Sequence, residues 1–536
     1  MTRVVVDPLT RIEGHLRIEV EVNNGVITDA WSAGTMARGI EILLKNRDPW
    51  DAPYVTSRLC GVCEGVHAIA SAQALEDAFD IELTEAGRLM RNVFCAGYYV
   101  HDHYVHFYVL SALDYLDIMA IANYKGSDPG LLGIKDKIVG LVVKGDTSPF
   151  TPRYEPDAFT VNDPDTVTTL VSHYIKAIEM KAKSQKMLNF ITGIQPHPNT
   201  VMVGGCVATP SREQLLALRE LWMEQKEFVD NVYLPDVLAV GTGPLFPLAK
   251  LAIGATDGNY LAYPMLPQDG AAKTEDISFG GSNHLFKGGV VNASGARGTL
   301  SDIAGINVAP VDYSKITESV TSSWYNYPAG TNALHPSAGV TEFNLNKSGA
   351  YSYFKSPRYS SKPMEVGPLA RGLVNKFPAL VDFFKAGGRE GVVARHLCRA
   401  LITKSIVDQG IAWIDRLIEL RTAGPLVGMN EKAVPRNAKG FGVWDAPRGA
   451  LGHWVEIENH RIKNYQMVVP STWNAGPRDE NGVKGPYEQS LIGAPVPDTE
   501  NPINVVRIIR SFDPCIACGV HVIDGRTGKV KVINLQ

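Results

Sequence analysis

The chain has 536 residues, of which 45% are apolar and 20% charged, and its formal net charge is −4. These are ordinary globular values, and a weakly acidic chain is not typical of a nucleic-acid-binding surface. The length exceeds that of one usual hydrophobic core, so we expect one very large domain or about two to three lobes. The N-terminal segment lacks the apolar core of a signal peptide, and no stretch predicts a membrane span.

The first half of the chain predicts a β-hairpin followed by helices. Residues 16–31 alternate apolar and polar side chains about an Asn-Gly pair, which is a strong hairpin signal. Helical spacing predicts a helix at 64–80, and one long helix or two at 84–124 with Thr84 as the N-cap.

Later segments alternate between predicted helices and irregular structure. Residues 125–165 are rich in Gly, Pro and Asp and predict a loop region, whereas 166–190 and 211–232 have helical patterns. Short alternating runs at about 255–365 predict irregular β structure with long loops, and helices return at 376–423.

A last pair of alternating runs follows Asp513 and predicts another hairpin. No repeat period or clean linker divides the chain. The predicted fold class is therefore α+β, with a helical core bundle, peripheral β-hairpins and long irregular loops.

The cysteines are few and odd in number, which indicates metal or redox chemistry more than a disulfide framework. They are Cys60, Cys63, Cys95, Cys206, Cys398, Cys515 and Cys518. Four of them form two Cys-x-x-C pairs at opposite ends of the chain, Cys60 with Cys63 and Cys515 with Cys518. A Cys-x-x-C turn lets two sulfurs converge on one ion, so two pairs supply four thiolates for zinc, copper(I), nickel or an iron-sulfur cluster.

From the residues alone, several interpretations of the two pairs stay open. One is a structural zinc clasp in a non-redox subunit, although zinc ribbons usually take both pairs from a short stretch. Another is a thioredoxin-like site, although neither pair follows a βαβ pattern. The first pair lies in a turn that enters the predicted helix at 64–80.

Six motifs occur in one order along nearly the whole chain: "TRIEGHLRIEVEV", "SRLCGVCEGVHA", "PHPNTVMVGG", "DAPRGALGHW", "VVPSTWN" and "DPCIACGVH". In these motifs the chain resembles the large, catalytic subunit of nickel-iron hydrogenases. The residues of the motifs are most similar to those of the respiratory uptake group. The resemblance implies a single large subunit over residues 1–536 that reversibly oxidises dihydrogen to protons and electrons. It speaks against a relative of respiratory complex I, which lacks the four cysteines.

The resemblance implies a nickel held by Cys60, Cys63, Cys515 and Cys518. In that family the thiolates matching Cys63 and Cys518 also bridge to an iron that carries two cyanides and one carbon monoxide. Position 515 is Cys and not selenocysteine. Strongly donating sulfurs suit nickel in an open geometry.

The resemblance also implies groups around the diatomic ligands. Arg448 and Ser471 match the donors to the cyanide nitrogens, and Pro447 matches the residue that shapes the carbon monoxide pocket. His67 lies one helical turn after Cys63, where its ring can donate to a thiolate sulfur. Taken alone, Arg448 predicts an ordinary ion pair with an acid such as Asp445, and Ser471 predicts a helix N-cap.

The resemblance also implies residues for proton transfer. Glu13 matches the family's relay glutamate, whereas a lone Glu at the start of a strand is usually a surface acid. Asp114 and Asp513 match acids that hold the guanidinium of Arg448, and either Arg448 or the thiolate of Cys515 receives the first proton.

A magnesium site near the C-terminus is implied as well, with Glu41, His521 and the backbone carbonyl of Met467 as ligands. His103 and His106 share a helical face, and we interpret them as packing residues that make hydrogen bonds. His197 in "PHPN" is expected to face a partner.

Electrons are expected to leave through another polypeptide. If four cysteines hold nickel, the other three are too few for a cysteine-ligated iron-sulfur cluster, and no nucleotide-binding glycine motif is present. The resemblance implies a heterodimer with an iron-sulfur small subunit, no nucleic-acid partner, and membrane association only through partners.

Maturation is implied by the residues that follow "DPCIACGVH". Family members are cut after the histidine matching His521 by an endopeptidase once nickel chaperones have delivered the metal, so we expect removal of 522–536. The resemblance places the mature protein on the periplasmic side of the membrane, exported with its partner, and the unprocessed chain in the cytoplasm.

Overall fold

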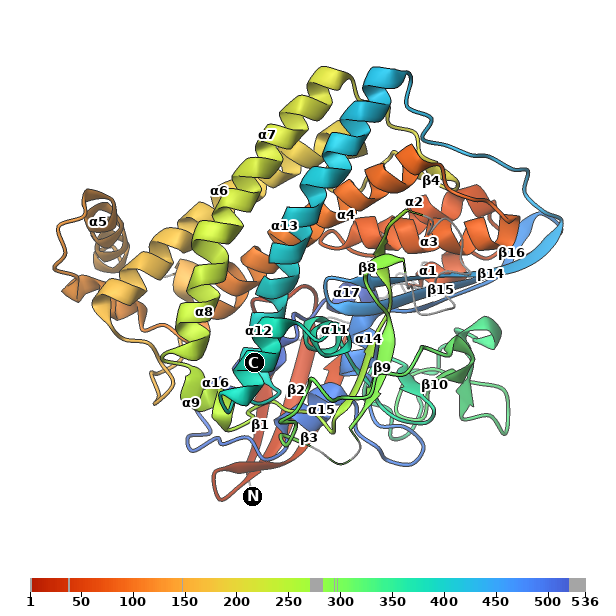
Figure 1. The fold of residues 1–536 in the computed structure, drawn as a ribbon. Helices are drawn as coiled ribbons and strands as arrows, with labels where there is room; N and C mark the ends of the chain where they lie inside the picture. The colour runs from red at the N-terminus through yellow and green to blue at the C-terminus, as the bar shows by residue number, and fades with distance from the viewer. Residues whose placement is uncertain are drawn as a thin grey trace.

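Four long helices form a bundle in which each helix packs against two of the others (Figure 1). They are α4 Glu85–Val105, α6 Pro164–Thr192, α7 Arg212–Phe228 and α13 Val392–Ala423. Thr84 caps α4 through a hydrogen bond from the Gly87 N–H, as the sequence predicts. The structure is a computed structural model that describes residues 2–36, 39–146, 148–269, 283–293, 295 and 297–519.

Shorter helices connect this bundle to the sheets. They are α1 Ile40–Leu43, α2 Ala52–Ser57, α3 Glu64–Phe79, α5 Pro129–Val143, α8 Leu234–Thr242, α9 Phe246–Lys250, α11 Pro368–Asn375, α12 Pro378–Lys385, α14 Pro470–Ala475, α15 Pro486–Leu491, α16 Ile503–Ser511 and α17 Ile516–Gly519. The helices predicted at 64–80, 166–190 and 211–232 are confirmed. The predicted segment 84–124 is α4 followed by a π-helical stretch, His106–Ser111, and short 3-10 turns.

The N-terminal hairpin is confirmed as part of a three-stranded antiparallel sheet. Its strands are β1 Thr2–Val6, β2 Leu16–Asn23 and β3 Val26–Gly34. The predicted irregular β region contains only short strands, from β6 Asn259–Ala262 through β7 Met265–Pro267, β8 His284–Phe286, β9 Gly289–Asn292, β10 Ile316–Ser319, β11 Ala333–Leu334 and β12 Ser356–Tyr359 to β13 Glu365–Val366. Two further short strands, β4 Val201–Met202 and β5 Gly205–Cys206, pair with each other.

A second antiparallel sheet, which the sequence analysis did not predict, packs directly against α3. Its strands are β14 Asn437–Ala446, β15 Gly449–Glu458 and β16 Arg461–Val468. Gly442 permits this contact, because a Cβ at that position would overlap the Ala70 carbonyl and the Ala74 amide of α3. The turn between β14 and β15 carries Pro447 and Arg448, so this sheet carries predicted site residues in the interior.

The prediction of a loop at 125–165 is wrong in part, because α5 occupies fifteen residues of it. Asp128 caps this helix by accepting from the Leu131 N–H, and Pro129 occupies its first turn, where a missing N–H costs nothing. Only Ile138 of α5 is buried, and the helix lies at one edge of the molecule (Figure 1). Its two internal glycines hide the helical pattern in the sequence.

The two ends of the described chain meet in the interior. Glu13 and Cys515 form a parallel β-bridge, in which the Glu13 N–H donates to the Pro514 carbonyl at 3.2 Å and the Ile516 N–H donates to the Glu13 carbonyl at 2.9 Å. Among the described residues, no helix has the length and apolar content to cross a bilayer. The hairpin predicted after Asp513 lies outside the described residues.

Candidate metal centre

Three cysteine sulfurs from the two ends of the chain converge at one buried point. The Cys515 Sγ lies 3.2 Å from the Cys60 Sγ and 3.6 Å from the Cys63 Sγ. These separations exceed the roughly 2.05 Å of a disulfide, and none of the three cysteines forms a disulfide. The three sulfurs are close enough to ligate one ion. The side chain of Cys518 lies outside the described atoms, so its predicted place as the fourth ligand stays a prediction.

Helix α3 begins immediately after the first cysteine pair. Cys63 is its N-cap residue, and the Val62 N–H donates to the Cys60 Sγ at 3.2 Å. Unsatisfied N–H groups and the positive end of the helix dipole favour a thiolate at this position. The local sequence therefore supplies both the sulfurs and a field that stabilises their ionised form.

Glu13 joins the N-terminal segment to the second cysteine loop. Its Oε2 accepts a hydrogen bond from the Ala517 N–H at 2.9 Å and lies 3.3 Å from the Cys515 Sγ. Burial, and secondarily the nearby Cys60, raises the pKa of Glu13. Gly14 is needed here because its φ is +81° and a Cβ would lie 2.8 Å from the Ala517 nitrogen. The structure therefore places the Glu13 carboxyl group beside the Cys515 sulfur, and this carboxyl group holds a proton more readily than an exposed glutamate does.

A small cavity of about 10 Å³ lies beside the cysteines. Six residues that the sequence analysis assigned to the site line it together, namely Cys63, His67, Pro447, Arg448, Ser471 and Cys515. Ser471 also accepts the Cys515 N–H at 3.0 Å, which leaves its hydroxyl hydrogen available as a donor. The remaining walls, such as Val66 and Leu451, are apolar.

Arg448 forms two buried ion pairs above this cavity. Its Nη1 lies 2.9 Å from Asp102 Oδ2, and its Nη2 lies 2.9 Å from Asp513 Oδ1. Burial raises the pKa of both carboxyl groups, and Arg448 opposes that rise. Burial alone lowers the pKa of Arg448, but the two carboxylates outweigh it and the net shift is upward. The Arg448 Nε has no hydrogen-bond partner among the described residues.

The prediction that Asp114 holds Arg448 is wrong. Asp114 lies on a 3-10 turn packed against α16, where its Oδ1 is 2.5 Å from Arg510 Nη1 and also contacts Arg11. Asp102, on the side of α4 that faces Arg448, takes the expected role. The sequence offered one signal for this role. Asp102 is an acid within an apolar helical stretch, and a buried carboxylate needs a positively charged or hydrogen-bonding partner. The alternative pairing of Arg448 with Asp445 is also excluded, because Asp445 pairs with Arg371.

A second polar cluster surrounds Glu41, which is fully buried. Its Oε1 accepts the Met467 N–H at 2.9 Å, and its Oε2 accepts from the Thr341 hydroxyl. Lys355 lies 3.7 Å from both Glu41 and Glu318, and burial raises the pKa of Glu318 to about 7. His521, the other predicted side-chain ligand, lies outside the described residues.

The predicted histidines occupy three different environments. His67 Nδ1 lies 3.2 Å from His453 Nε2, and the ring borders the small cavity. His103 contacts the Thr403 hydroxyl and His106 contacts the Arg510 carbonyl, which is the packing role expected for both. His197 is partly exposed, and its Nδ1 lies 3.0 Å from the Ser57 carbonyl.

Sequence reasoning missed Glu64, the residue after Cys63. It is fully buried, and its Oε1 accepts from the Tyr98 hydroxyl and from the His197 N–H, the latter at 3.1 Å. Burial raises the pKa of Glu64 to about 7. A charged residue directly after a cysteine in an otherwise apolar helix start was the available signal.

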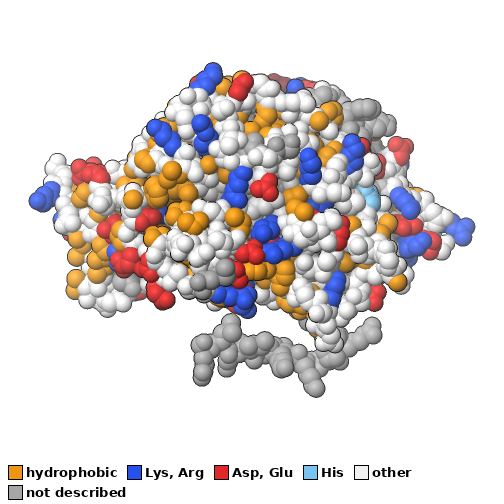
Figure 2. Space-filling view, turned by 90° about the horizontal axis from the view of Figure 1, so that it is seen from below, with side chains coloured by type: hydrophobic (Ala, Val, Ile, Leu, Met, Phe, Trp, Pro, Cys, Tyr) orange, Lys and Arg blue, Asp and Glu red, His pale blue; other side chains and the backbone are white. Residues whose placement is uncertain are grey.

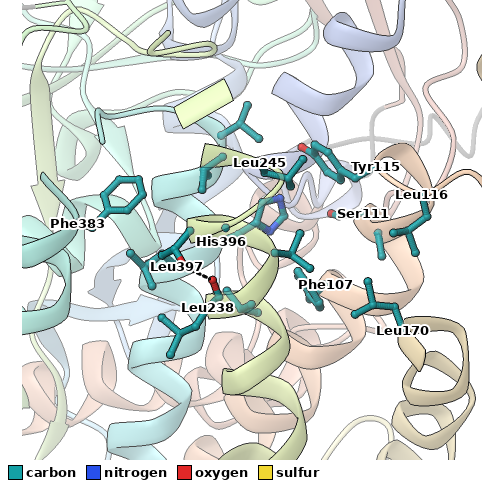
Figure 3. Close-up of a pocket in the computed structure, with 17 residues that line it drawn as sticks. Phe107, Ser111, Tyr115, Leu116, Leu170, Leu238, Leu245, Phe383, His396 and Leu397 are labelled. Carbon is teal, nitrogen blue, oxygen red and sulfur yellow. Dashed lines mark hydrogen bonds between the residues drawn. The ribbon is translucent and has the colours of Figure 1, made fainter. Parts of the chain in front are cut away.

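An apolar cavity of about 30 Å³ lies apart from the cysteines, between α8, α12 and α13 (Figure 3). His396 projects into its centre, with Tyr115 and Ser111 to one side. Neither ring nitrogen of His396 has a hydrogen-bond partner among the described residues. Burial lowers the pKa of His396 well below its usual range, so the ring is neutral.

We expect His396→Leu to be neutral or to stabilise the chain by about 1 kcal/mol, because a buried polar group without partners costs free energy that an apolar side chain avoids. Thermal unfolding of the variant and the wild-type protein measures the difference. A clear loss of stability would contradict this expectation and show that contacts of the ring, such as its stacking on His106, outweigh the cost of its unpaired nitrogens.

Comparison with known proteins agrees with this geometry. A model of the nickel-dependent hydrogenase family matches residues 38–521, and a model described as HoxL-like matches residues 3–32. The uptake hydrogenase large subunit of Bradyrhizobium diazoefficiens is 37% identical over 99% of this chain and 97% of its own length. The hydrogenase-1 large chain of Escherichia coli is 33% identical over 97% and 95%, respectively.

Solved structures give the same result. The reduced, active Ni-Fe-Se hydrogenase of Desulfomicrobium baculatum superposes with a TM-score of 0.82 at 33% identity, over 97% of this chain and all of the matched chain. These similarities favour a nickel-iron centre over a zinc clasp. The chain belongs to the nickel-dependent hydrogenase family, as the large, catalytic subunit of an uptake-type nickel-iron hydrogenase.

Proposed function

We propose that Cys60, Cys63, Cys515 and Cys518 hold the nickel of this hydrogenase, and that Cys63 and Cys518 also bridge to the iron. The observation that carries the proposal is the convergence of three sulfurs from two chain ends in one buried place. Soft thiolates suit nickel, and the dipole of α3 favours their ionised form. When bound, the nickel-iron centre supplies the reversible oxidation of dihydrogen to protons and electrons.

We further propose that the small cavity beside Cys63 receives the diatomic ligands of the iron, two cyanides and one carbon monoxide. Cyanide nitrogens require buried donors, and the cavity offers the Ser471 hydroxyl and the Arg448 guanidinium. Arg448 Nε is a buried donor without a partner among the described residues, which fits such an acceptor. Pro447 and Leu451 supply the apolar wall that suits carbon monoxide.

Proton transfer is assigned to Cys515 and Glu13. The Cys515 sulfur receives the proton and passes it to Glu13 Oε2, which lies within hydrogen-bonding distance. Arg448 is the less suitable acceptor, because the carboxylates of Asp102 and Asp513 stabilise its protonated form. These two acids instead fix the guanidinium above the cavity.

A magnesium ion is proposed at the Glu41 cluster, with His521 and the Met467 carbonyl as the other protein ligands. The carboxylates of Glu41 and Glu318 supply the oxygen donors that Mg²⁺ prefers. Lys355 already balances part of their charge, so magnesium and Lys355 share this site.

Electrons leave through a small subunit that carries iron-sulfur clusters, with which this chain forms a heterodimer. The three remaining cysteines support an external route, because Cys95, Cys206 and Cys398 are buried as separate free thiols. Exposed apolar side chains, among them Tyr54 and Ile194, suit a partner-facing surface. Tyr54 lies on α2, the helix whose Ser57 carbonyl contacts His197. The face shown in Figure 2 instead mixes apolar, acidic and basic side chains.

Maturation and location follow from the same family membership. An endopeptidase is proposed to remove 522–536 after nickel chaperones have loaded the site. One relative is named a periplasmic hydrogenase and others uptake hydrogenases, so we propose a periplasmic location reached through the exported partner.

The test is metal analysis and infrared spectroscopy of the processed heterodimer, followed by dihydrogen-dependent dye reduction. Nickel, iron, cyanide and carbon monoxide bands, and dye reduction, are expected. Zinc alone, without diatomic bands, would overturn the proposal and favour a structural clasp.

We expect Cys515→Ser to abolish nickel binding, because a serine hydroxyl is a poor ligand for nickel and the other sulfurs cannot complete the site. Elemental analysis of the purified chain measures the nickel content. Cys398→Ser is the matched control, since Cys398 is equally buried but is not among the sulfurs that converge, and it should keep its nickel. Retention of nickel in Cys515→Ser would remove this cysteine from the ligand set.

A further inference from the structure

Helix α16 ends four residues before Cys515, and the chain between them contains a residue, Asp513, in an unusual backbone conformation. The Asp513 N–H donates to the Arg510 carbonyl at 2.8 Å, and Asp513 has a φ of +62°. This left-handed conformation is normally taken by Gly or Asn at the end of a helix. Asp is one of the few other residues that adopt it, and here the Asp513 carboxylate also pairs with Arg448. Such strain persists only where the surroundings fix it.

Two buried side chains from other helices bind the carbonyl groups at this helix end. His106 Nε2 lies 2.7 Å from the Arg510 carbonyl, and Arg399 Nη2 donates to the Ser511 carbonyl at 3.0 Å. Both side chains are almost completely buried. Terminal carbonyls of a helix lack intrahelical partners and carry partial negative charge, so an N–H donor and a cation are the groups that satisfy them.

The protonation state of His106 follows from this contact. A carbonyl oxygen can only accept, so His106 Nε2 must carry the hydrogen. Burial, and next the charge of Arg399, lowers the pKa of His106 well below its usual range, so the ring donates as the neutral tautomer. The Arg510 carbonyl therefore accepts from two donors at once, the ring of His106 and the backbone of Asp513.

Arg399 also completes the charge balance of the site. The guanidinium of Arg399 is a second buried positive charge near Asp513, in addition to that of Arg448. Asp513 is the strongest favourable electrostatic contact of Arg399. Two buried acids, Asp102 and Asp513, are thus matched by two buried arginines. Removal of Arg399 leaves the acids with one cation between them.

We infer that His106 and Arg399 are positioning residues, which clamp the C-terminal end of α16 and thereby set the Asp513 carboxylate and the Cys515 sulfur. The clamp consists of protein groups alone, the ring of His106 and the guanidinium of Arg399 on the carbonyl groups of Arg510 and Ser511. Its consequence for catalysis rests on the proposed role of Cys515 as a nickel ligand.

Amide hydrogen exchange of the full, metal-free chain tests the clamp. We expect His106→Leu and Arg399→Met each to speed exchange in residues 510–517 by about tenfold, the value of one hydrogen bond. His106→Gln should restore protection, because its amide nitrogen can reach the Arg510 carbonyl. His103→Leu is the matched control, since His103 is equally buried in the last turn of α4, just before His106, but contacts Thr403 and not α16.

The processed heterodimer gives a second readout. His106→Leu should shift the infrared bands of the active site and His106→Gln should not. If His106→Leu fails to fold, His106→Asn replaces it, because its amide is too short to reach the carbonyl. Equal exchange at 510–517 in the His106 and His103 variants would overturn the clamp. A different outcome is that His106→Leu speeds exchange while Cys515→Ser keeps its nickel. In that case the clamp would stand and the proposed ligand set would be overturned.

Discussion

Glu13→Gln is expected to lower dihydrogen oxidation by about 100- to 10 000-fold, the usual contribution of a positioned proton-transfer group. Glutamine keeps the hydrogen bond from the Ala517 N–H but cannot take a proton from the Cys515 sulfur. The loss should therefore appear in turnover, while the bound metals and their infrared bands stay as in the wild-type heterodimer. Dye reduction and infrared spectroscopy on the same sample measure both quantities.

Glu19→Gln is the matched control for this experiment. Glu19 lies on β2 and pairs with the exposed side chains of Arg3 and Arg17, not with a cysteine. It should keep full activity. Wild-type turnover in Glu13→Gln, with the metals present, would show that protons leave by another route.

Asp102→Asn and Asp114→Asn are expected to fail in different ways. Asp102 orients Arg448 above the cavity, so its loss should reduce turnover about 100-fold, as a small misplacement of a site group does. The effect on folding should be smaller, because Arg448 keeps its ion pair with Asp513. Asp114 pairs with Arg510 and Arg11 away from the cavity, so its loss leaves buried positive charge and should cost about 3–5 kcal/mol of stability.

The two readouts separate these roles. Unfolding in denaturant measures the stability of each variant, and dye reduction per bound nickel measures the turnover of the molecules that remain folded. If Asp114→Asn lost turnover per nickel while Asp102→Asn kept it, the assignment from the sequence would be right and the one from the structure wrong.

The sequence predicts best what local pattern or motif identity decides. The hairpin at 16–31 and the helix at 64–80 have regular periods, and the structure contains both. Helix α5 was missed because Gly133 and Gly140 weaken its pattern, although Asp128 and Pro129 form a good helix start. Local sequence signals thus predict many of the helices and strands, but not all of them.

Non-local placement could not be read from the sequence. Asp102 and Asp114 both lie after the first cysteine pair, and the π-helical stretch 106–111 between them changes the direction of Asp114 relative to Asp102. The sheet β14–β16 also escaped prediction, because β15 and the ends of β14 and β16 next to it are buried on both sides and lack an alternating pattern. Which carboxylate meets Arg448 is decided by this packing.

The contact between Cys60 and Cys515 spans 455 positions of the chain. At a synthesis rate of about 5–20 residues per second, Cys60 leaves the ribosome roughly 20 to 90 seconds before Cys515 exists. During that interval the first two thiols have no counterpart from the other chain end. A cell that makes this protein must therefore shield them from oxidants and stray metals until translation is complete.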